Sequence, residues 1–131
     1  MIDLEKAKIG VIGLGYVGLP IACEFGRKYE TLGYDINASR VTALNEGRDS
    51  TLEISPEELL ASKRLKFSSE VSSLKKCNIY IVTVPTPIDK YKNPDLGPLK
   101  SASRLIGSMI NKNDIVVYES TVFPGCTEEE C

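Results

Sequence analysis

The chain has 131 residues, 42% of them hydrophobic and 26% charged, and this length and composition fit one globular domain. A formal net charge of −2 argues against a nucleic-acid-binding domain, which usually carries a basic patch. No apolar run approaches the roughly 18 residues of a membrane span, and the first residues, MIDLEKAKIG, lack the apolar segment of a secretory signal.

Four cysteines and no histidine restrict the chemistry of the chain. None of the cysteines forms a C-x-x-C pair, which argues against a zinc site, and the lack of histidine removes the usual general base. Cys23 and Cys77 lie in apolar surroundings, where we expect them to pack as small hydrophobes. Free cysteines are typical of a reducing compartment, so we expect a cytoplasmic protein.

Strand and helix patterns alternate along the whole chain. Short apolar runs predict strands over residues 8–12, 31–34, 65–67, 79–84 and 114–118. Helices are predicted from the glycine-rich turn to about residue 28, from an N-cap at Asn37 to about residue 46, and over 70–76 and 99–110. The order Ser-Pro-Glu-Glu at 55–58 predicts another helix start, and Pro124-Gly125 is expected to break the chain after the last strand.

Strands that are apolar on both faces indicate a parallel sheet covered by helices on both sides. We therefore predict a doubly wound α/β fold, the Rossmann arrangement, with five or six strands in the order 3-2-1-4-5.

The stretch GVIGLGYVGLP, residues 10–20, places Gly13, Gly15 and Gly18 at the spacing G-x-G-x-x-G. Alone, this spacing describes either a phosphate-binding loop or a tight turn between a strand and a helix. Here it follows a strand and opens a helix, where Gly13 permits the turn, Gly15 lets a pyrophosphate approach the backbone and Gly18 allows close packing. The helix N-terminus favours an anion, so we predict that the turn binds the pyrophosphate of NAD.

Two polar residues near the end of the second predicted strand bear on the choice of cofactor. Asp35 follows Gly13 by 22 residues, where a carboxylate accepts hydrogen bonds from an adenosine ribose and repels a 2′-phosphate, which favours NAD over NADP. The alternative is that Asp35 only precedes and caps a helix. Arg40 either lies near the adenosine or is a solvated helix residue.

Four segments in order, KIGVIGLGYVGLP, VPTP, NPDLGPLKSAS and VVYESTVFPGCTEE, resemble the N-terminal domain of the UDP-glucose/GDP-mannose dehydrogenase family. The form of the last segment is most similar to the branch that oxidises UDP-N-acetylhexosamines. The resemblance implies oxidation of the sugar's C6 hydroxyl to a carboxylate with two NAD, through a cysteine-linked intermediate. It also implies a UDP-sugar partner and a homodimer of the full-length protein, without nucleic-acid or membrane partners.

The resemblance also assigns roles to residues of this chain. The implied contacts to NAD are Gly13, Gly15, Tyr16, Val17, Gly18, Asp35, Arg40, Val84, Pro85, Thr86, Ser120 and Thr121. Ser120 and Thr121 would face the nicotinamide end, and Thr121 would position the hydrolytic water. Without the resemblance, the proline-rich exit at 85–87 is a rigid strand end and residues 120–121 form a capped turn.

The resemblance leaves the family's nucleophilic cysteine and its lysine, asparagine and aspartate partners beyond Cys131, and the position of Cys126 belongs to a turn in that family. We therefore expect residues 1–131 to be an NAD-binding domain, truncated before its end and lacking the central and UDP-sugar domains, that does not turn over sugar alone. The alternatives are a free-standing NAD(H)-sensing module and the NAD domain of a hydroxyacid or 6-phosphogluconate-type dehydrogenase.

Overall fold

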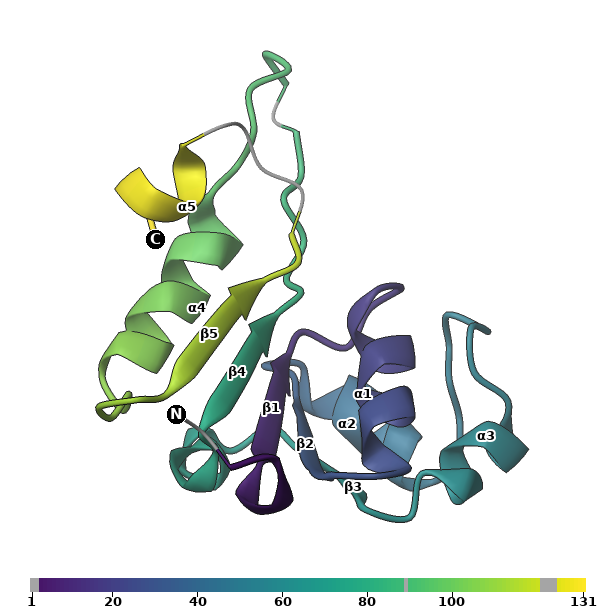
Figure 1. The fold of residues 1–131 in the computed structure, drawn as a ribbon. Coiled ribbons are helices and arrows are strands. Elements are labelled where there is room, and N and C mark those ends of the chain that lie inside the picture. The colour runs from purple at the N-terminus through teal and green to yellow at the C-terminus, as the bar shows by residue number, and fades with distance from the viewer. Residues whose placement is uncertain (1–2, 89, 121–124) are drawn as a thin grey trace.

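The structure is a computed structural model that describes residues 3–88, 90–120 and 125–131 (Figure 1). Its strands are β1 (Lys8–Ile12), β2 (Glu30–Tyr34), β3 (Leu65–Ser68), β4 (Ile79–Val82) and β5 (Ile115–Tyr118). Its α-helices are α1 (Gly18–Gly26), α2 (Ala38–Asn45), α3 (Pro56–Ala61), α4 (Gly97–Gly107) and α5 (Cys126–Glu129). Two short 3-10 helices, η1 (Leu4–Lys6) and η2 (Val71–Lys76), precede β1 and β4.

The five described strands form one sheet in the order β3-β2-β1-β4-β5, and every neighbouring pair is parallel. The predicted doubly wound fold and its strand order are therefore confirmed. Because all the strands run in the same direction, their carboxyl ends lie along a single edge of the sheet (Figure 1). The turn before α1, the segment after β2 and the exits of β4 and β5 all leave from that edge.

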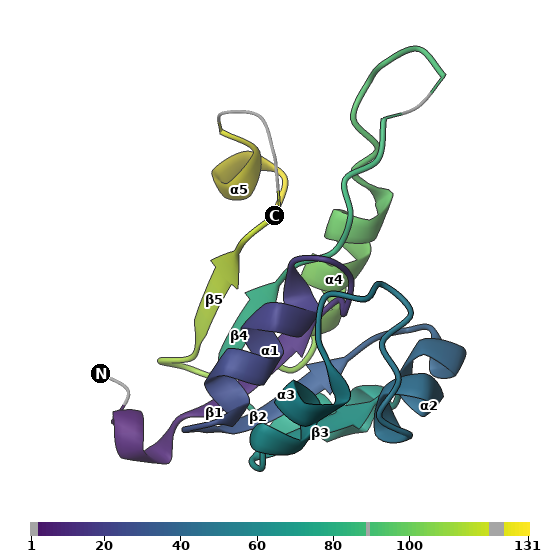
Figure 2. The same cartoon turned by 90° about the vertical axis from the view of Figure 1, so that its right-hand side faces the viewer.

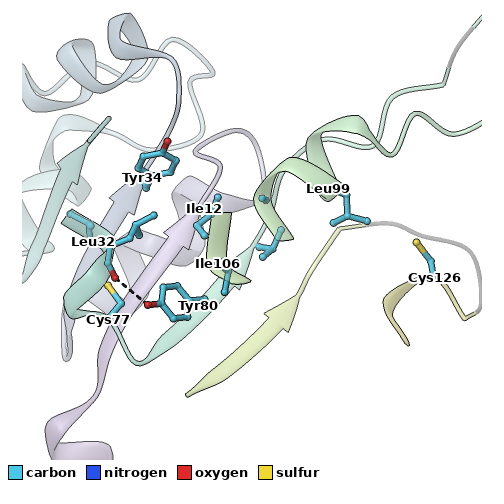
Figure 3. Packing of buried hydrophobic residues seen from close by; sticks show 11 residues of the cluster. Ile12, Leu32, Tyr34, Cys77, Tyr80, Leu99, Ile106 and Cys126 are labelled. Carbon is cyan, nitrogen blue, oxygen red and sulfur yellow. Dashed lines mark hydrogen bonds between the residues drawn. The ribbon is translucent and has the colours of Figure 1, made fainter. Parts of the chain in front are cut away.

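Alternating side chains of the strands pack on opposite faces of the sheet, so each face has its own core. Ile9 and Val11 of β1 and Ile81 of β4 pack with α1 on one face. On the other face, Tyr80 and Val82 of β4 pack with η2, α4 and α5 in a cluster that also holds Ile12, Leu32, Tyr34, Leu74, Cys77, Leu99, Ala102, Ile106 and Cys126 (Figure 3). Figure 2 shows α1 and α4 on opposite sides of the sheet.

Local sequence signals set the helix starts. The Asn37 side chain accepts a hydrogen bond from the backbone N–H of Arg40 and caps α2 as predicted. Ser55 and Glu58 form the predicted capping box of α3, with Pro56 in the first turn. The backbone of Gly47, just past α2, has a φ of +81°, which glycine adopts without strain.

Several predicted boundaries or elements differ in the structure, including the end of α4, which lies at Gly107 rather than at residue 110. Strand β4 ends at Val82 rather than at residue 84, because the Thr83 hydroxyl turns back to the Ile12 and Gly13 carbonyls and Pro85 has no N–H for a ladder bond. Helix α4 begins at Gly97, two residues earlier than predicted, since Pro98 suits a first helical turn. The chain also forms the short helix α5 directly after Gly125, where only a chain break was predicted.

Candidate functional site

A cleft of about 1050 Å³ lies along the carboxyl edge of the sheet. The glycine turn, the segment after β2, the exits of β4 and β5 and one face of α4 form its walls. Its lining includes Gly13, Gly15, Tyr16, Val17, Asp35, Arg40, Val84, Pro85, Thr86 and Ser120. The fold thus brings together predicted contacts that are more than 100 positions apart in the sequence. Gly18 is not part of this lining, and Thr121 lies outside the described residues.

The three glycines of the turn have different structural requirements. Gly13 has a φ of +101°, and its backbone N–H donates to the Tyr34 carbonyl at 2.9 Å. A Cβ on Gly18 would lie 1.7 Å from the Gly13 carbonyl oxygen, so the approach of α1 to the turn requires glycine there. A Cβ on Gly15 would meet no atom within 4 Å, and its φ is not positive. The fold therefore explains two of the glycines and leaves the third, which lines the cleft, unexplained.

Asp35 holds the glycine turn against the end of β2. One carboxylate oxygen accepts from the Leu14 backbone N–H at 2.9 Å, and the other accepts from the Asn37 N–H at the same distance. The N-cap of α2 is Asn37 itself. Each carboxylate oxygen has a further lone pair, so these bonds leave acceptor capacity for a ligand hydroxyl in the cleft.

Arg40 has a buried environment, and the interpretation of a solvated helix residue is wrong. Only 9% of its side chain is exposed. Its Nε and Nη2 donate to the Leu14 carbonyl at 2.9 and 2.7 Å, and its Nη1 donates to Asp49 at 2.7 Å. A guanidinium presents several donors in a fixed plane and is well suited to such a forked contact. Arg40 therefore contacts the backbone of the glycine turn directly, while its predicted position near the adenosine stays a prediction.

The partner of Arg40 is a carboxylate that the sequence patterns did not single out. The side chain of Asp49 is fully buried, and it accepts hydrogen bonds from Thr51, Glu53 and Ile54 as well as from Arg40. Burial by itself raises the pKa of Asp49, but the bonds from Thr51, Arg40 and Ile54 outweigh it and hold the pKa well below the ordinary value. Asp49 is thus a buried anion that neutralises Arg40.

The exits of β4 and β5 are joined beside the turn. The Thr83 hydroxyl contacts the carbonyl oxygens of Ile12 and Gly13 at 3.1 and 2.7 Å. The Ser120 hydroxyl donates to the Val84 carbonyl at 2.8 Å. These contacts give the proline-containing exit of β4 a fixed position at the wall of the cleft. Thr83 was not predicted as a site residue, although a polar residue at the end of an apolar strand is a usable signal.

The buried thiols have raised pKa values, which is the opposite of what a nucleophilic cysteine needs. Burial raises the pKa of Cys23, and burial raises that of Cys77 to about 11. Cys126 is the first residue of α5, is fully buried, and also has a raised pKa because of burial. All three pack in the cores of the sheet, which confirms the packing role predicted for Cys23 and Cys77 and agrees with the structural role expected of Cys126.

Two other kinds of site, a metal centre and a membrane span, are not found within residues 3–88, 90–120 and 125–131. In these ranges no three histidine, cysteine, aspartate or glutamate residues are grouped so that they could hold a metal ion. None of the helices described above has the length and apolar character needed to cross a membrane.

The parallel sheet, the G-x-G-x-x-G turn and the carboxylate at the end of β2 define the class of dinucleotide-binding domains. Within this class, residues 7–131 match the NAD binding domain of the UDP-glucose/GDP-mannose dehydrogenase family. The chain belongs to this family and is its NAD-binding domain, with NAD as the cofactor, as the sequence predicted.

The relatives agree with this assignment. The chain is 55% identical over 131 residues to UDP-N-acetyl-D-glucosamine 6-dehydrogenase of Salmonella typhi, and it covers 31% of that protein. A solved structure of UDP-N-acetyl-mannosamine dehydrogenase from Pyrococcus horikoshii matches with a TM-score of 0.82 and a sequence identity of 35%. The match covers 93% of this chain and 30% of the chain of that structure. The structure of GDP-mannose dehydrogenase from Pseudomonas aeruginosa has a TM-score of 0.84 and a sequence identity of 27%, and the match again covers 93% of this chain and 30% of that one. The chain thus spans about a third of the length of these relatives.

Proposed function

We propose that the cleft at the carboxyl edge holds NAD and that the full-length protein oxidises the C6 hydroxyl of a UDP-N-acetylhexosamine to the carboxylate. The observation that carries the cofactor site is Gly15, which is exposed, lines the cleft and has open space where a Cβ would stand. Gly15 has no conformational or packing requirement within the chain. A ligand that approaches the backbone supplies the missing requirement.

Other features of the cleft fit a dinucleotide. The glycine turn leads into the N-terminus of α1, where backbone N–H groups and the helix dipole favour a pyrophosphate. The Asp35 carboxylate would accept the ribose hydroxyls. Tyr16, Val17 and Ile36 line the cleft and are 69%, 51% and 87% exposed. A ligand with flat apolar faces would cover apolar surface of this kind.

The predicted contacts would lie against different parts of the dinucleotide along the cleft. Gly13, Gly15, Tyr16, Val17 and Gly18 would surround the pyrophosphate, with Gly18 acting through the packing of α1. Val84, Pro85 and Thr86 would border the adenosine-side ribose and the pyrophosphate, and Arg40 would lie near the adenosine. Ser120 and Thr121 would face the nicotinamide end, and Thr121 would orient the hydrolytic water. Bound NAD supplies the hydride acceptor.

The choice of substrate rests on the relatives. A protein 55% identical to the whole chain is a UDP-N-acetyl-D-glucosamine 6-dehydrogenase, and one 36% identical is a UDP-N-acetyl-D-mannosamine dehydrogenase. Both act on UDP-linked N-acetylhexosamines, which supports this class over UDP-glucose. None of the buried thiols described above has the low pKa of a nucleophile, so the proposal assigns the catalytic cysteine to another part of the full-length protein.

The proposal also includes a location and an assembly. Free cysteines at positions 23, 77, 126 and 131 suit a reducing cytoplasm, which would also hold the pools of NAD and UDP-sugar. The homodimer rests on the family resemblance alone.

The test is a panel of nucleotide sugars on the full-length protein, with NADH formation followed by absorbance. We expect turnover of one UDP-N-acetylhexosamine and two NADH for each uronate, whereas UDP-glucose and GDP-mannose are poor substrates. Turnover of UDP-glucose alone would contradict the substrate class. Tight NADH binding without turnover of any nucleotide sugar would support an NAD(H)-sensing module instead.

A further inference from the structure

Asp49 lies in the segment between α2 and α3, outside the motifs that predict NAD binding. Its side chain has no exposed surface. One carboxylate oxygen accepts from Arg40 Nη1 at 2.7 Å and from the N–H and hydroxyl of Thr51 at 2.9 and 2.7 Å. The other accepts from the backbone N–H groups of Glu53 and Ile54 at 2.8 and 3.0 Å. Five hydrogen bonds therefore fix the Asp49 carboxylate.

Arg40 connects this carboxylate to the glycine turn. Two of its nitrogens bond the Leu14 carbonyl, while the N–H of Leu14 bonds Asp35. The residue between Gly13 and Gly15 is thus held at its N–H by a carboxylate and at its carbonyl by a guanidinium. The position of the turn depends on where the guanidinium lies, and Asp49 fixes that position together with the Ser50 hydroxyl, which accepts from Arg40 Nη1 at 3.1 Å.

The charge of Arg40 is compensated at the same time. Arg40 lies at the wall of the cleft near the carboxylate proposed to bind the adenosine ribose. A cation in this place normally accommodates the 2′-phosphate of NADP. Because Arg40 is paired with a buried anion and only 9% exposed, the charge that remains toward the ribose is that of Asp35.

We propose that Asp49 is a positioning residue that holds Arg40 against the glycine turn and thereby sets the preference for NAD over NADP. This inference rests on the proposed function, because it requires that the cleft holds a dinucleotide. A carboxylate with no contact to the cofactor then contributes to cofactor choice through one intermediate side chain.

The experiment measures the dissociation constants of NADH and NADPH for the full-length protein, as wild type and as Asp49→Asn. The amide keeps the shape, removes the charge and replaces one of the two accepting oxygens by an NH2 group. We expect NADH to bind several-fold more weakly and the preference for NADH over NADPH to fall about tenfold, because the guanidinium is left uncompensated beside the ribose site. The relative gain of NADPH should shrink at higher salt, since it is electrostatic.

A merely structural role for Asp49 has a different result. It would weaken both dinucleotides by the same factor at every salt concentration, and an unchanged preference would overturn the proposal. The double variant Asp49→Asn with Arg40→Met should lose the gain of NADPH, because the cation that causes it is gone. A gain that persists in the double variant would equally overturn the proposal.

A second variant, Thr51→Val, tests the proposal even if Asp49→Asn does not fold. It removes the hydroxyl that bonds the same oxygen as Arg40 and leaves the carboxylate charged. We expect the preference for NADH to fall about two- to threefold as the hold on Arg40 loosens. No change in this variant would overturn the proposal. Wild-type protein that binds neither dinucleotide would instead refute the proposed function, so the two failures are distinguishable.

Discussion

The two edges of the sheet differ in how many charged side chains they carry and in how firmly hydrogen bonds hold those side chains. The amino edge has a recess of about 250 Å³ lined by four exposed cations, Lys8, Arg64, Lys66 and Lys76, and by Glu30. An ion pair in this recess joins Lys76 Nζ to Glu30 Oε1 at 3.7 Å, and the two side chains are 48% and 44% exposed. The carboxyl edge has fewer charges around a cleft of about 1050 Å³, and two of them, Asp35 and Arg40, are each fixed by two or more hydrogen bonds. Fixed geometry, rather than the number of charges, distinguishes the cleft that we propose to bind NAD.

The topology of the sheet causes this difference. Each parallel strand ends at the carboxyl edge and leads into a turn or a helix N-terminus, so backbone N–H groups and strand exits collect there. Exposed pairs such as Lys76–Glu30 contribute little to stability because water screens them. A buried pair such as Arg40–Asp49 is expensive to break, because one partner is left as an unpaired buried charge. The following predictions compare the two edges, beginning with the largest effect.

Gly18→Ala should prevent stable folding. The added Cβ would lie 1.7 Å from a backbone oxygen and 2.4 Å from the Thr83 hydroxyl, and only a shift of α1 relieves this contact. We expect a loss of more than about 4 kcal/mol in the free energy of unfolding, measured by denaturant titration. A midpoint within error of wild type would show that the turn is looser than described.

Arg40→Met should destabilise the protein by about 3 kcal/mol, because it leaves Asp49 buried without its cation. Lys76→Met at the amino edge is the matched control, and it should change the free energy of unfolding by less than about 0.5 kcal/mol. Denaturant titrations of the two variants side by side test the comparison. Equal effects would remove the distinction between the two edges.

Acid should weaken the carboxyl edge through Asp49. Its pKa in the folded protein is lowered below the unfolded value of about 3.9, so its stabilising contribution is complete above that pH and is lost as the pH falls further. We expect the urea midpoint of wild type to fall more steeply between about pH 4 and pH 2 than that of Asp49→Asn. Parallel curves would show that Asp49 is not the responsible group.

The smallest effect that we expect is the influence of alkaline pH on stability through Cys77 at the amino edge. Burial raises its pKa to about 11, which outweighs the opposite influence of Lys76. Its thiol therefore stays protonated at neutral pH. The contribution of the protonated thiol to the free energy of unfolding is lost only as the pH rises from about 9, the unfolded pKa, through the pKa in the folded protein. A thiol reagent at pH 8 should modify Cys77 only after unfolding. Rapid labelling of the folded protein would contradict the burial of this edge.

Regular local patterns made most of the fold predictable. The strand at Lys8–Ile12, the cap at Asn37 and the capping box at Ser55 depend on residues close in sequence, and all three are confirmed. The strand order followed from alternation of elements and strands apolar on both faces. The short helix α5 was missed because four residues do not establish a helical period.

The candidate site was predictable only in part. The glycine spacing and Asp35 form a recurring pattern, so sequence alone located one wall of the cleft. Asp49 was missed because a single aspartate in a polar segment has no pattern, and its importance comes from burial against Arg40 nine positions earlier. Arg40 itself was left open, since its helix position did not show that the Leu14 carbonyl lies within reach.

Gly15 provides the most direct test of the central claim, which is that the turn exists to bind NAD and not only to fold. Gly15→Ala places a Cβ in open space, so the free energy of unfolding should be unchanged or slightly increased. The same Cβ should hinder the approach of the pyrophosphate. Gly107→Ala is the matched control, because its Cβ also meets no atom within 4 Å and it lies at the end of α4.

The measurement is a titration of full-length wild type, Gly15→Ala and Gly107→Ala with NADH, alongside their thermal unfolding. The account predicts that all three proteins are equally stable within about 1 kcal/mol and that only Gly15→Ala binds NADH about tenfold or more weakly. Wild-type affinity in Gly15→Ala would contradict the account, because the glycine would then serve neither the fold nor the cofactor.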